Sequence, residues 1–261
     1  MFVHKIGEGL PLVMLHGFPL DHRSLLPFED FLADKGQWQR YYIDLPGLGA
    51  KGADTEIRGA QDVLEKLVEY LDREFHGRQF AVVGYSFGCL LASALAARYG
   101  SQIIGLFLLA PETIAVQEKR SLATKAAYQV SELPGTATKD EREAYETTAI
   151  VHSAESFEAF RRYVYPGLAI NADNPNVQAV MEHPSLAHAP ESYLREYREP
   201  VTIVTAQHDT MVGYRDAFHL YETLHEGTYA CIPRAGHNIH LEQPGMVGML
   251  FQSWLKGIEK H

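Results

Sequence analysis

The sequence predicts an α/β protein with a doubly wound, mostly parallel sheet and an inserted helical cap. Short apolar runs recur along the chain, and helical patterns lie between them. Nearly continuous apolar runs are typical of parallel strands covered on both faces, and their alternation with helices favours a parallel sheet. One long stretch in the middle of the chain shows helical patterns alone, which indicates an insertion into that sheet.

The overall composition restricts the class of protein. The chain has 261 residues, 46% apolar and 21% charged, as in a soluble globular protein of one or two domains. Its formal charge of −10 argues against nucleic acid and anionic membranes as partners, because both need a basic face. No apolar run is long enough to span a bilayer, and the N-terminal MFVHKIGEGL lacks the pattern of a signal peptide. We therefore expect a cytoplasmic protein, either a monomer or a small homo-oligomer.

The two cysteines, Cys89 and Cys231, lie in apolar segments without the spacing of metal ligands. Cysteine behaves as a small apolar residue when it packs in a core. We expect two buried free thiols, which fits a reducing cytoplasm better than a disulfide does.

Seven segments are expected to form strands. The first, FVHKIG, alternates between apolar and polar residues and is expected to be an antiparallel edge strand. The other six are near-continuous apolar runs, as parallel strands are. They read LPLVMLHG, RYYIDLPG, QFAVVGYS, IIGLFLLAP, PVTIVTAQ and TYACIPRAG.

Two helices of the sheet are clear. Residues 56–75 carry apolar side chains at helical spacing on one face and charged side chains on the other. Residues 86–99 are rich in alanine and leucine, so this second helix is expected to be buried.

The stretch between Glu112 and Pro200 interrupts the alternation, because it shows amphipathic helical patterns and no convincing strand. A single crossover helix would need far fewer residues. We therefore assign residues 1–111 and 200–261 to the sheet core, and residues 112–199 to a helical cap, or lid. The alternative is an irregular loop with one long helix.

The strongest chemical signal is Gly84-Tyr85-Ser86-Phe87-Gly88, which follows a strand and opens a helix. This G-x-S-x-G pattern is a nucleophile elbow, in which a sharp turn presents the serine hydroxyl at the carboxyl end of the sheet. The glycines leave room for strand and helix to approach each other. The alternative is a glycine-rich turn with an incidental serine.

A serine nucleophile needs a base and an acid that orients the base. His237 follows the last strand, and Asp209 follows the strand before it, which gives the chain order Ser86, Asp209, His237. Glu112, directly after another strand, is the competing acid, and Asp209 alternatively only forms a turn. We predict that Ser86, Asp209 and His237 are the catalytic residues.

The oxyanion of an acyl-transfer reaction needs preorganised backbone donors. The amide of Phe87, directly after the nucleophile, is the first candidate. The amide of Phe18 is the second, in the loop His16-Gly17-Phe18-Pro19 at the end of an early strand. An ordinary strand-ending turn is the alternative for that loop. Phe18, Phe87 and Tyr85 are also predicted to contact the substrate.

Four blocks of this chain resemble motifs of the α/β-hydrolase superfamily, in the family's order. LHGFPLDHRS resembles the oxyanion loop, DLPGLG the turn after the next strand, VGYSFG the elbow, and AGHNIHLEQP the histidine motif. The resemblance is closest to compact bacterial esterase-like members with a helical lid. It implies the α/β-hydrolase fold and cofactor-free hydrolysis through a covalent enzyme intermediate.

Several features depart from the family pattern. The family's first strand is lacking, so we expect a shorter sheet. Cys89 stands where many relatives have a glycine, and Asn238 stands where an apolar residue is usual. HGFP replaces the glycine run of the bulky-alcohol ester group, and Ser86 separates the chain from dehalogenases, which use an aspartate there.

We therefore predict an α/β-fold serine hydrolase that cleaves a small carboxylic ester, lactone or thioester without cofactor or metal. A carbon–carbon bond hydrolase or cofactor-free lyase with the same triad is one alternative, and a non-catalytic ligand receptor is another. His237 and His240 lack the carboxylate–histidine cluster that a metal site needs. Asp44 is expected to cap the DLPG turn rather than to take part in chemistry.

Overall fold

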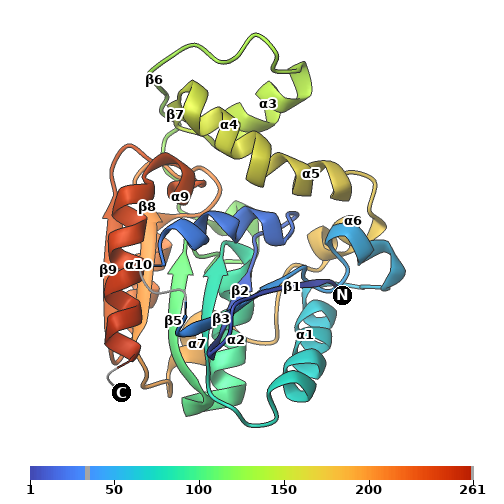
Figure 1. The fold of residues 1–261 in the computed structure, drawn as a ribbon, viewed down its shortest axis with the longest axis vertical. Coiled ribbons are helices and arrows are strands. Elements are labelled where there is room, and N and C mark those ends of the chain that lie inside the picture. The colour runs from blue at the N-terminus through green and yellow to red at the C-terminus, as the bar shows by residue number, and fades with distance from the viewer. Residues whose placement is uncertain (33–35, 260–261) are drawn as a thin grey trace.

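The structure is a computed structural model that describes residues 1–32 and 36–259, and a twisted seven-stranded sheet lies between layers of helices (Figure 1). All seven predicted strands form. They are β1 (Val3–Ile6), β2 (Leu10–Leu15), β3 (Trp38–Ile43), β4 (Phe80–Tyr85), β5 (Ile103–Leu109), β8 (Val201–Ala206) and β9 (Gly227–Ile232).

The strand order is β1-β3-β2-β4-β5-β8-β9. β1 pairs antiparallel with β3 at one edge, as its alternating pattern predicts, and the other pairings are parallel. The carboxyl ends of β4, β8 and β9 therefore lie along the same edge of the sheet.

Both faces of the central strands are buried, and alternate residues of these strands enter different apolar clusters. On β2, Val13 and Leu15 face the side of α1 (Ala60–Phe75) and α2 (Phe87–Tyr99), whereas Leu12 and Met14 face the other side. That other side holds η1 (His22–Asp30) and α10 (Pro244–Ile258). Burial on both faces explains the near-continuous apolar runs.

The predicted helix over residues 56–75 begins four residues late, at Ala60. The preceding segment is bonded to the middle of the chain: the side chain of Asn176 accepts the amide of Ile57, and the carbonyl of His183 accepts the amide of Ala60. These tertiary hydrogen bonds hold the chain out of the helix. The second predicted helix forms with Ser86 as its N-cap residue.

Shorter helical elements lie between the strands or after the last one. They are η2 (Gly49–Asp54), η3 (Gly100–Gln102), η4 (Gln117–Lys119), α8 (Tyr214–Tyr221) and α9 (Ile239–Glu242). α8 packs against β8 and β9, and α9 leads directly into α10.

Residues 112–199 contain five α-helices separated by non-helical segments, and they lie largely over the carboxyl edge of the sheet (Figure 1). The helices are α3 (Lys139–Thr148), α4 (Ala154–Tyr163), α5 (Tyr165–Asn171), α6 (Pro175–Glu182) and α7 (Pro190–Leu194). Against the expectation of no strand here, β6 (Tyr128–Gln129) and β7 (Val151–His152) pair in parallel. Two-residue strands are too short to leave a periodic pattern in a sequence. α7 packs on α2, so this segment returns to the core before β8.

The expectation for the cysteines is half right. Both thiols are free and Cys89 is buried, but Cys231 is exposed. Cys231 lies on β9, and an edge strand keeps fewer neighbours than a central strand does. Among the described helices, none is both long enough and apolar enough to cross a membrane.

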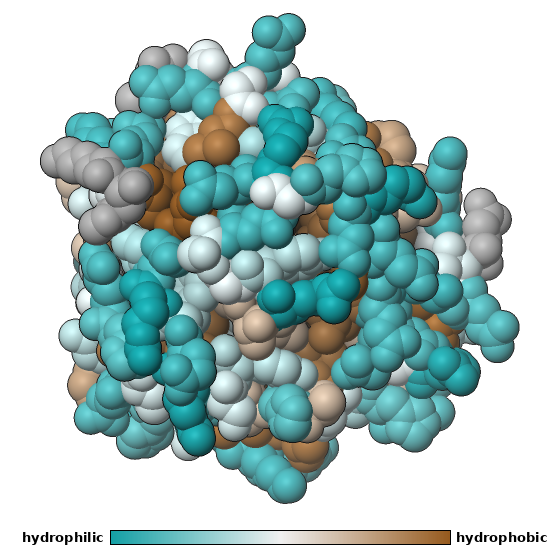
Figure 2. All heavy atoms as spheres, turned by 90° about the horizontal axis from the view of Figure 1, so that it is seen from below, coloured by the Kyte–Doolittle hydropathy of each residue, from teal (hydrophilic) through white to brown (hydrophobic). Residues whose placement is uncertain are grey.

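The face opposite the carboxyl edge is mainly hydrophilic, with apolar side chains showing between polar ones (Figure 2). A hollow of ≈ 450 Å³ on this face is lined in part by Leu10 and Trp38, the first residues of β2 and β3. It lies at the amino ends of the strands and thus away from Ser86, which follows the carboxyl end of β4.

Candidate active site

Three predicted residues meet at the carboxyl edge of the sheet. The Oγ of Ser86 lies 3.1 Å from Nε2 of His237, and Nδ1 of His237 lies 2.8 Å from Oδ2 of Asp209. All three residues are buried. Because a carboxylate only accepts, Nδ1 carries the ring proton, and Nε2 is left to accept the Ser86 hydroxyl. The arrangement can remove a proton from Ser86.

The turn at Ser86 has the strain that the elbow predicts. Ser86 has φ 53° and ψ −115°, a left-handed conformation that L-residues rarely adopt. A Cβ on Gly88 would lie 2.1 Å from the carbonyl oxygen of Leu15, and one on Gly84 would lie 2.8 Å from the Cys89 backbone. Both positions therefore require glycine because the backbones approach too closely for a side chain.

The acid is held on both of its oxygens. While Oδ2 of Asp209 bonds to His237, Oδ1 accepts the amides of Met211 at 2.8 Å and Val212 at 3.0 Å. These bonds fix the carboxylate against its own loop, so that the imidazole has one orientation. Of the two candidate acids, Asp209 is the one whose carboxylate bonds to the imidazole.

The competing acid, Glu112, also lies near the site, where its amide donates to the carbonyl of Ser86 at 3.2 Å. Its carboxylate pairs with Arg120, at 3.0 Å from Nη2. Burial raises the pKa of Glu112 to about 7, against the opposing effect of Arg120. The arginine also donates to the carbonyls of Ile114, Ala115 and Met211.

Sequence reasoning missed Arg120, because a single arginine directly after the short η4 carries no local signal of its partners. Its guanidinium joins Glu112 to Met211, two residues beyond Asp209, and so braces the loop that carries the acid.

The two predicted oxyanion residues lie side by side. The rings of Phe18 and Phe87 pack edge to face with centroids 5.9 Å apart. Phe87 is the first residue of α2, where an amide has no partner within the helix. A Cβ on Gly17 would lie 3.1 Å from the Ser86 Cβ, so the loop before Phe18 runs close to the nucleophile. Their role as oxyanion donors stays a prediction.

His16 holds that loop in place. Its Nε2 accepts the amide of Leu45 at 2.9 Å, so the proton resides on Nδ1, which donates to the carbonyl of Gly17 at 2.8 Å. Burial lowers the pKa of His16 and keeps the ring neutral, as this pair of bonds requires.

Tyr85 is fully buried, and its hydroxyl donates to Oδ1 of Asn238 at 2.8 Å. A substrate contact by this side chain stays a prediction. The ring of His240 is bonded elsewhere than at the triad, because its Nε2 donates to the carbonyl of Ser24. Burial lowers the pKa of His240 to about 4.

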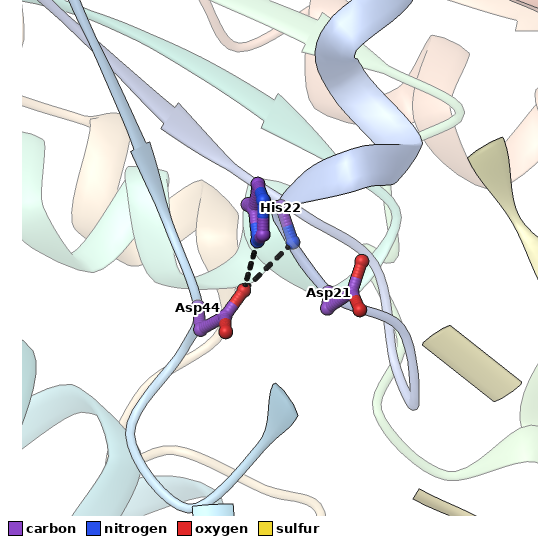
Figure 3. Close-up of side chains that lie close together, drawn as sticks. All are labelled: Asp21, His22 and Asp44. Atoms are coloured by element: carbon purple, nitrogen blue, oxygen red, sulfur yellow. Dashed lines mark hydrogen bonds and ion pairs between the residues drawn. The ribbon is translucent and has the colours of Figure 1, made fainter. Parts of the chain in front are cut away.

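Asp21, His22 and Asp44 form a compact cluster whose candidate ligand atoms lie within 4.8 Å of one another (Figure 3). Asp44 does not cap the DLPG turn: its Oδ1 accepts the amide of His22 at 3.0 Å and lies 2.6 Å from Nδ1 of that ring. Arg23 binds both oxygens of Asp21. These contacts describe a support for the 21–22 loop, and a metal would have to displace them.

Comparison with known proteins assigns the chain to a family. The model of the alpha/beta hydrolase family matches residues 12–247. The chain is 28% identical over 246 residues to the 2-succinyl-6-hydroxy-2,4-cyclohexadiene-1-carboxylate synthase of Enterobacter sp. (strain 638), covering 92% of this chain and 89% of that protein.

A second relative is the pimeloyl-[acyl-carrier protein] methyl ester esterase of Shewanella sp. (strain MR-7), with 31% identity over 106 residues. That match covers 40% of this chain and 36% of the esterase. Among solved structures, an alpha/beta superfamily hydrolase from Oenococcus oeni PSU-1 has a TM-score of 0.91 and 26% identity, covering 98% of this chain and 96% of that one.

Proposed function

The chain belongs to the α/β-hydrolase family, and on that premise we propose that it hydrolyses a small carboxylic ester, lactone or thioester through an acyl-enzyme intermediate. The observation that supports this most directly is the continuous path from the Ser86 hydroxyl through His237 to Asp209. A path of this kind activates a hydroxyl that is otherwise a poor nucleophile.

In the first half of the reaction, Ser86 Oγ attacks the acyl carbon while Nε2 of His237 takes the hydroxyl proton. The amides of Phe18 and Phe87 hold the negative oxygen of the tetrahedral intermediate. His237 then gives its proton to the leaving oxygen or sulfur, and the acyl group stays on Ser86. Asp209 stabilises the imidazolium throughout without taking the proton.

In the second half, His237 removes a proton from water, which attacks the acyl carbon. Collapse of the second intermediate returns the proton to Ser86 Oγ and releases the carboxylic acid. No cofactor enters these steps. We assign residues 112–199 as the lid that covers the acyl group, since most of this segment lies over the same edge of the sheet as Ser86 (Figure 1).

A fluorophosphonate probe and a panel of p-nitrophenyl esters of increasing acyl length test this function. Wild-type protein is expected to be labelled at Ser86 and to turn over the short esters, and Ser86→Ala is expected to lose both properties. Failure to label Ser86 would favour the non-catalytic receptor instead.

A second candidate is a cofactor-free lyase or a carbon–carbon bond hydrolase on the same triad. The match to the synthase favours it, because that relative aligns over 92% of this chain, whereas the esterase aligns over 40%. Labelling of Ser86 without turnover of any ester would support this candidate. Formation of the cyclohexadiene carboxylate that the relative's name gives, monitored by the absorbance of its conjugated diene, would establish this second candidate.

The expected cytoplasmic location and the expected monomeric or small homo-oligomeric state stay predictions. Gel filtration of the purified protein measures the second directly.

A further inference from the structure

A buried hydrogen-bond chain runs from the residue before the nucleophile to the segment over the sheet. The hydroxyl of Tyr85 donates to Oδ1 of Asn238 at 2.8 Å, and Nδ2 of Asn238 donates to Oγ1 of Thr148 at 2.9 Å. Tyr85 and Asn238 are buried, so water cannot readily replace these partners. The chain therefore links β4, the histidine loop and the end of α3.

His237 lies inside this network on its backbone side. Its amide donates to the carbonyl of Thr148 at 3.3 Å, and its carbonyl accepts the Tyr85 hydroxyl at 3.3 Å. The ring of Tyr85 lies against the imidazole, with centroids 5.2 Å apart and a 33° tilt. Tyr85 and Thr148 thus restrain both the backbone and the ring of the base.

Glu242 also bonds to both the segment after α3 and the loop that carries His237. Its Oε2 accepts the amide of Gly236 at 2.6 Å, directly before the histidine. Its Oε1 accepts the amides of Ile150 at 2.5 Å and Val151 at 2.7 Å. Residues 148–151 and 236–238 are therefore joined on either side of His237, and a displacement of one segment moves the other.

We propose that Tyr85, Asn238 and Thr148 are positioning residues. They hold the His237 ring within hydrogen-bond distance of Ser86 and link the base to residues 112–199. This inference rests on the proposed function, since it assigns a role within the same triad. The three side chains bond to one another and to the base loop, so they act through His237.

The consequence is a change in the rate of proton transfer rather than in substrate affinity. General-base catalysis depends on a Ser86–His237 contact within hydrogen-bond reach, and a misplacement of about 1 Å can cost roughly 100-fold in rate. A substrate that fits under residues 112–199 would also steady the base through Thr148.

Near-isosteric variants test the proposal. Tyr85→Phe removes the hydroxyl but keeps the ring on His237, and Thr148→Val removes the acceptor of Asn238. Each is expected to lower kcat for a p-nitrophenyl ester about tenfold, with KM changed less than twofold. Thr148→Ser keeps a hydroxyl and is expected to restore most of kcat. Thr147→Val makes the same change at an exposed neighbour and should leave kcat unchanged.

A spectroscopic measurement makes the test independent of substrate. The Nδ1 proton of His237, held by Asp209, should give a sharp downfield resonance in wild-type protein. That resonance should broaden or shift in Tyr85→Phe and Thr148→Val and should recover in Thr148→Ser. If Thr148→Val fails to fold, as judged by thermal melting, Tyr85→Phe alone decides the outcome.

The proposal is overturned if Tyr85→Phe keeps the wild-type kcat and resonance, or if Thr148→Ser loses as much as Thr148→Val. A wild-type protein that neither hydrolyses esters nor labels at Ser86 contradicts the proposed function instead. In that case the resonance comparison still decides whether the hydrogen bonds from Tyr85 through Asn238 to Thr148 position the imidazole.

Discussion

Asp209 bonds to His237 across 28 residues of sequence with one carboxylate oxygen, and uses the other to bond to its own loop. An aspartate that formed only a local turn would need the second set of bonds alone. The 2.8 Å contact between Oδ2 and Nδ1 makes the acid part of the site and selects the ring tautomer that leaves Nε2 free to accept a proton.

Replacing Asp209 by Asn should lower kcat by about four orders of magnitude, because an amide nitrogen facing Nδ1 favours the wrong tautomer. KM is expected to change little. Steady-state kinetics on a p-nitrophenyl ester measures both constants. Because Arg120 holds Glu112, the double variant Asp209→Asn/Glu112→Gln should be no slower than the single one. A much slower double variant would mean that Glu112 substitutes as the acid.

Substitution of Gly88 by Ala should destabilise the protein by about 3 kcal/mol or more, because its Cβ would meet the Leu15 carbonyl oxygen at 2.1 Å. The matched control is Gly257→Ala in α10, where a Cβ meets nothing within 4 Å. That change should stabilise the helix by about 0.5–1 kcal/mol. Urea denaturation of both variants gives the comparison, and equal midpoints would contradict the close approach.

Glu112 should make stability depend on pH. Its pKa is about 7 in the folded protein, against an ordinary value of 4.5 that applies when the chain is unfolded. The folded state therefore keeps this proton to higher pH, so the contribution of Glu112 to stability falls as pH rises from 4.5 to 7. A glutamine in place of Glu112 has no proton to lose and stays neutral across this pH range.

The stability of Glu112→Gln relative to wild type should therefore increase from pH 4.5 to pH 7, by up to about 3 kcal/mol. Denaturant midpoints measured at several pH values for both proteins isolate this residue, since other groups titrate equally in each. A difference that stays flat with pH would show that the Glu112 carboxyl ionises normally.

Loss of the His16 ring nitrogens should loosen the loop of Phe18. His16→Phe leaves the buried Leu45 amide without its acceptor, at a cost of about 1–3 kcal/mol. kcat should fall as well if the amide of Phe18 binds the oxyanion. His219→Phe, at an exposed position on α8, is the control for the same change of side chain. Thermal unfolding together with ester turnover separates the two effects.

Much of the fold follows from local patterns. The central strands β2, β4, β5 and β8 are almost continuously apolar because both sheet faces are covered there, and β1 alternates because it lies at an edge. The elbow was recognisable because Gly84 and Gly88 are required by close backbone contacts, which leave a fixed spacing in the sequence.

Features that depend on distant partners were not recognisable. The start of α1 is set by Asn176 and His183, far along the chain. The exposure of Cys231 depends on where β9 falls in the sheet, and the bond of Asp44 to His22 depends on how two loops meet. None of these residues carries a local pattern that names its partner.

Local patterns were sufficient to predict the alternation of strands and helices, the order Ser86, Asp209, His237 and the need for glycine around the nucleophile, since these depend on periodicity and short-range sterics. The choice between Asp209 and Glu112 as partner of the imidazole, and the bond between Thr148 and Asn238, came from the packed fold. Hydrogen bonds between segments depend on distances of a few tenths of an ångström across the fold, and such distances exist only once the sheet and its covering helices have packed.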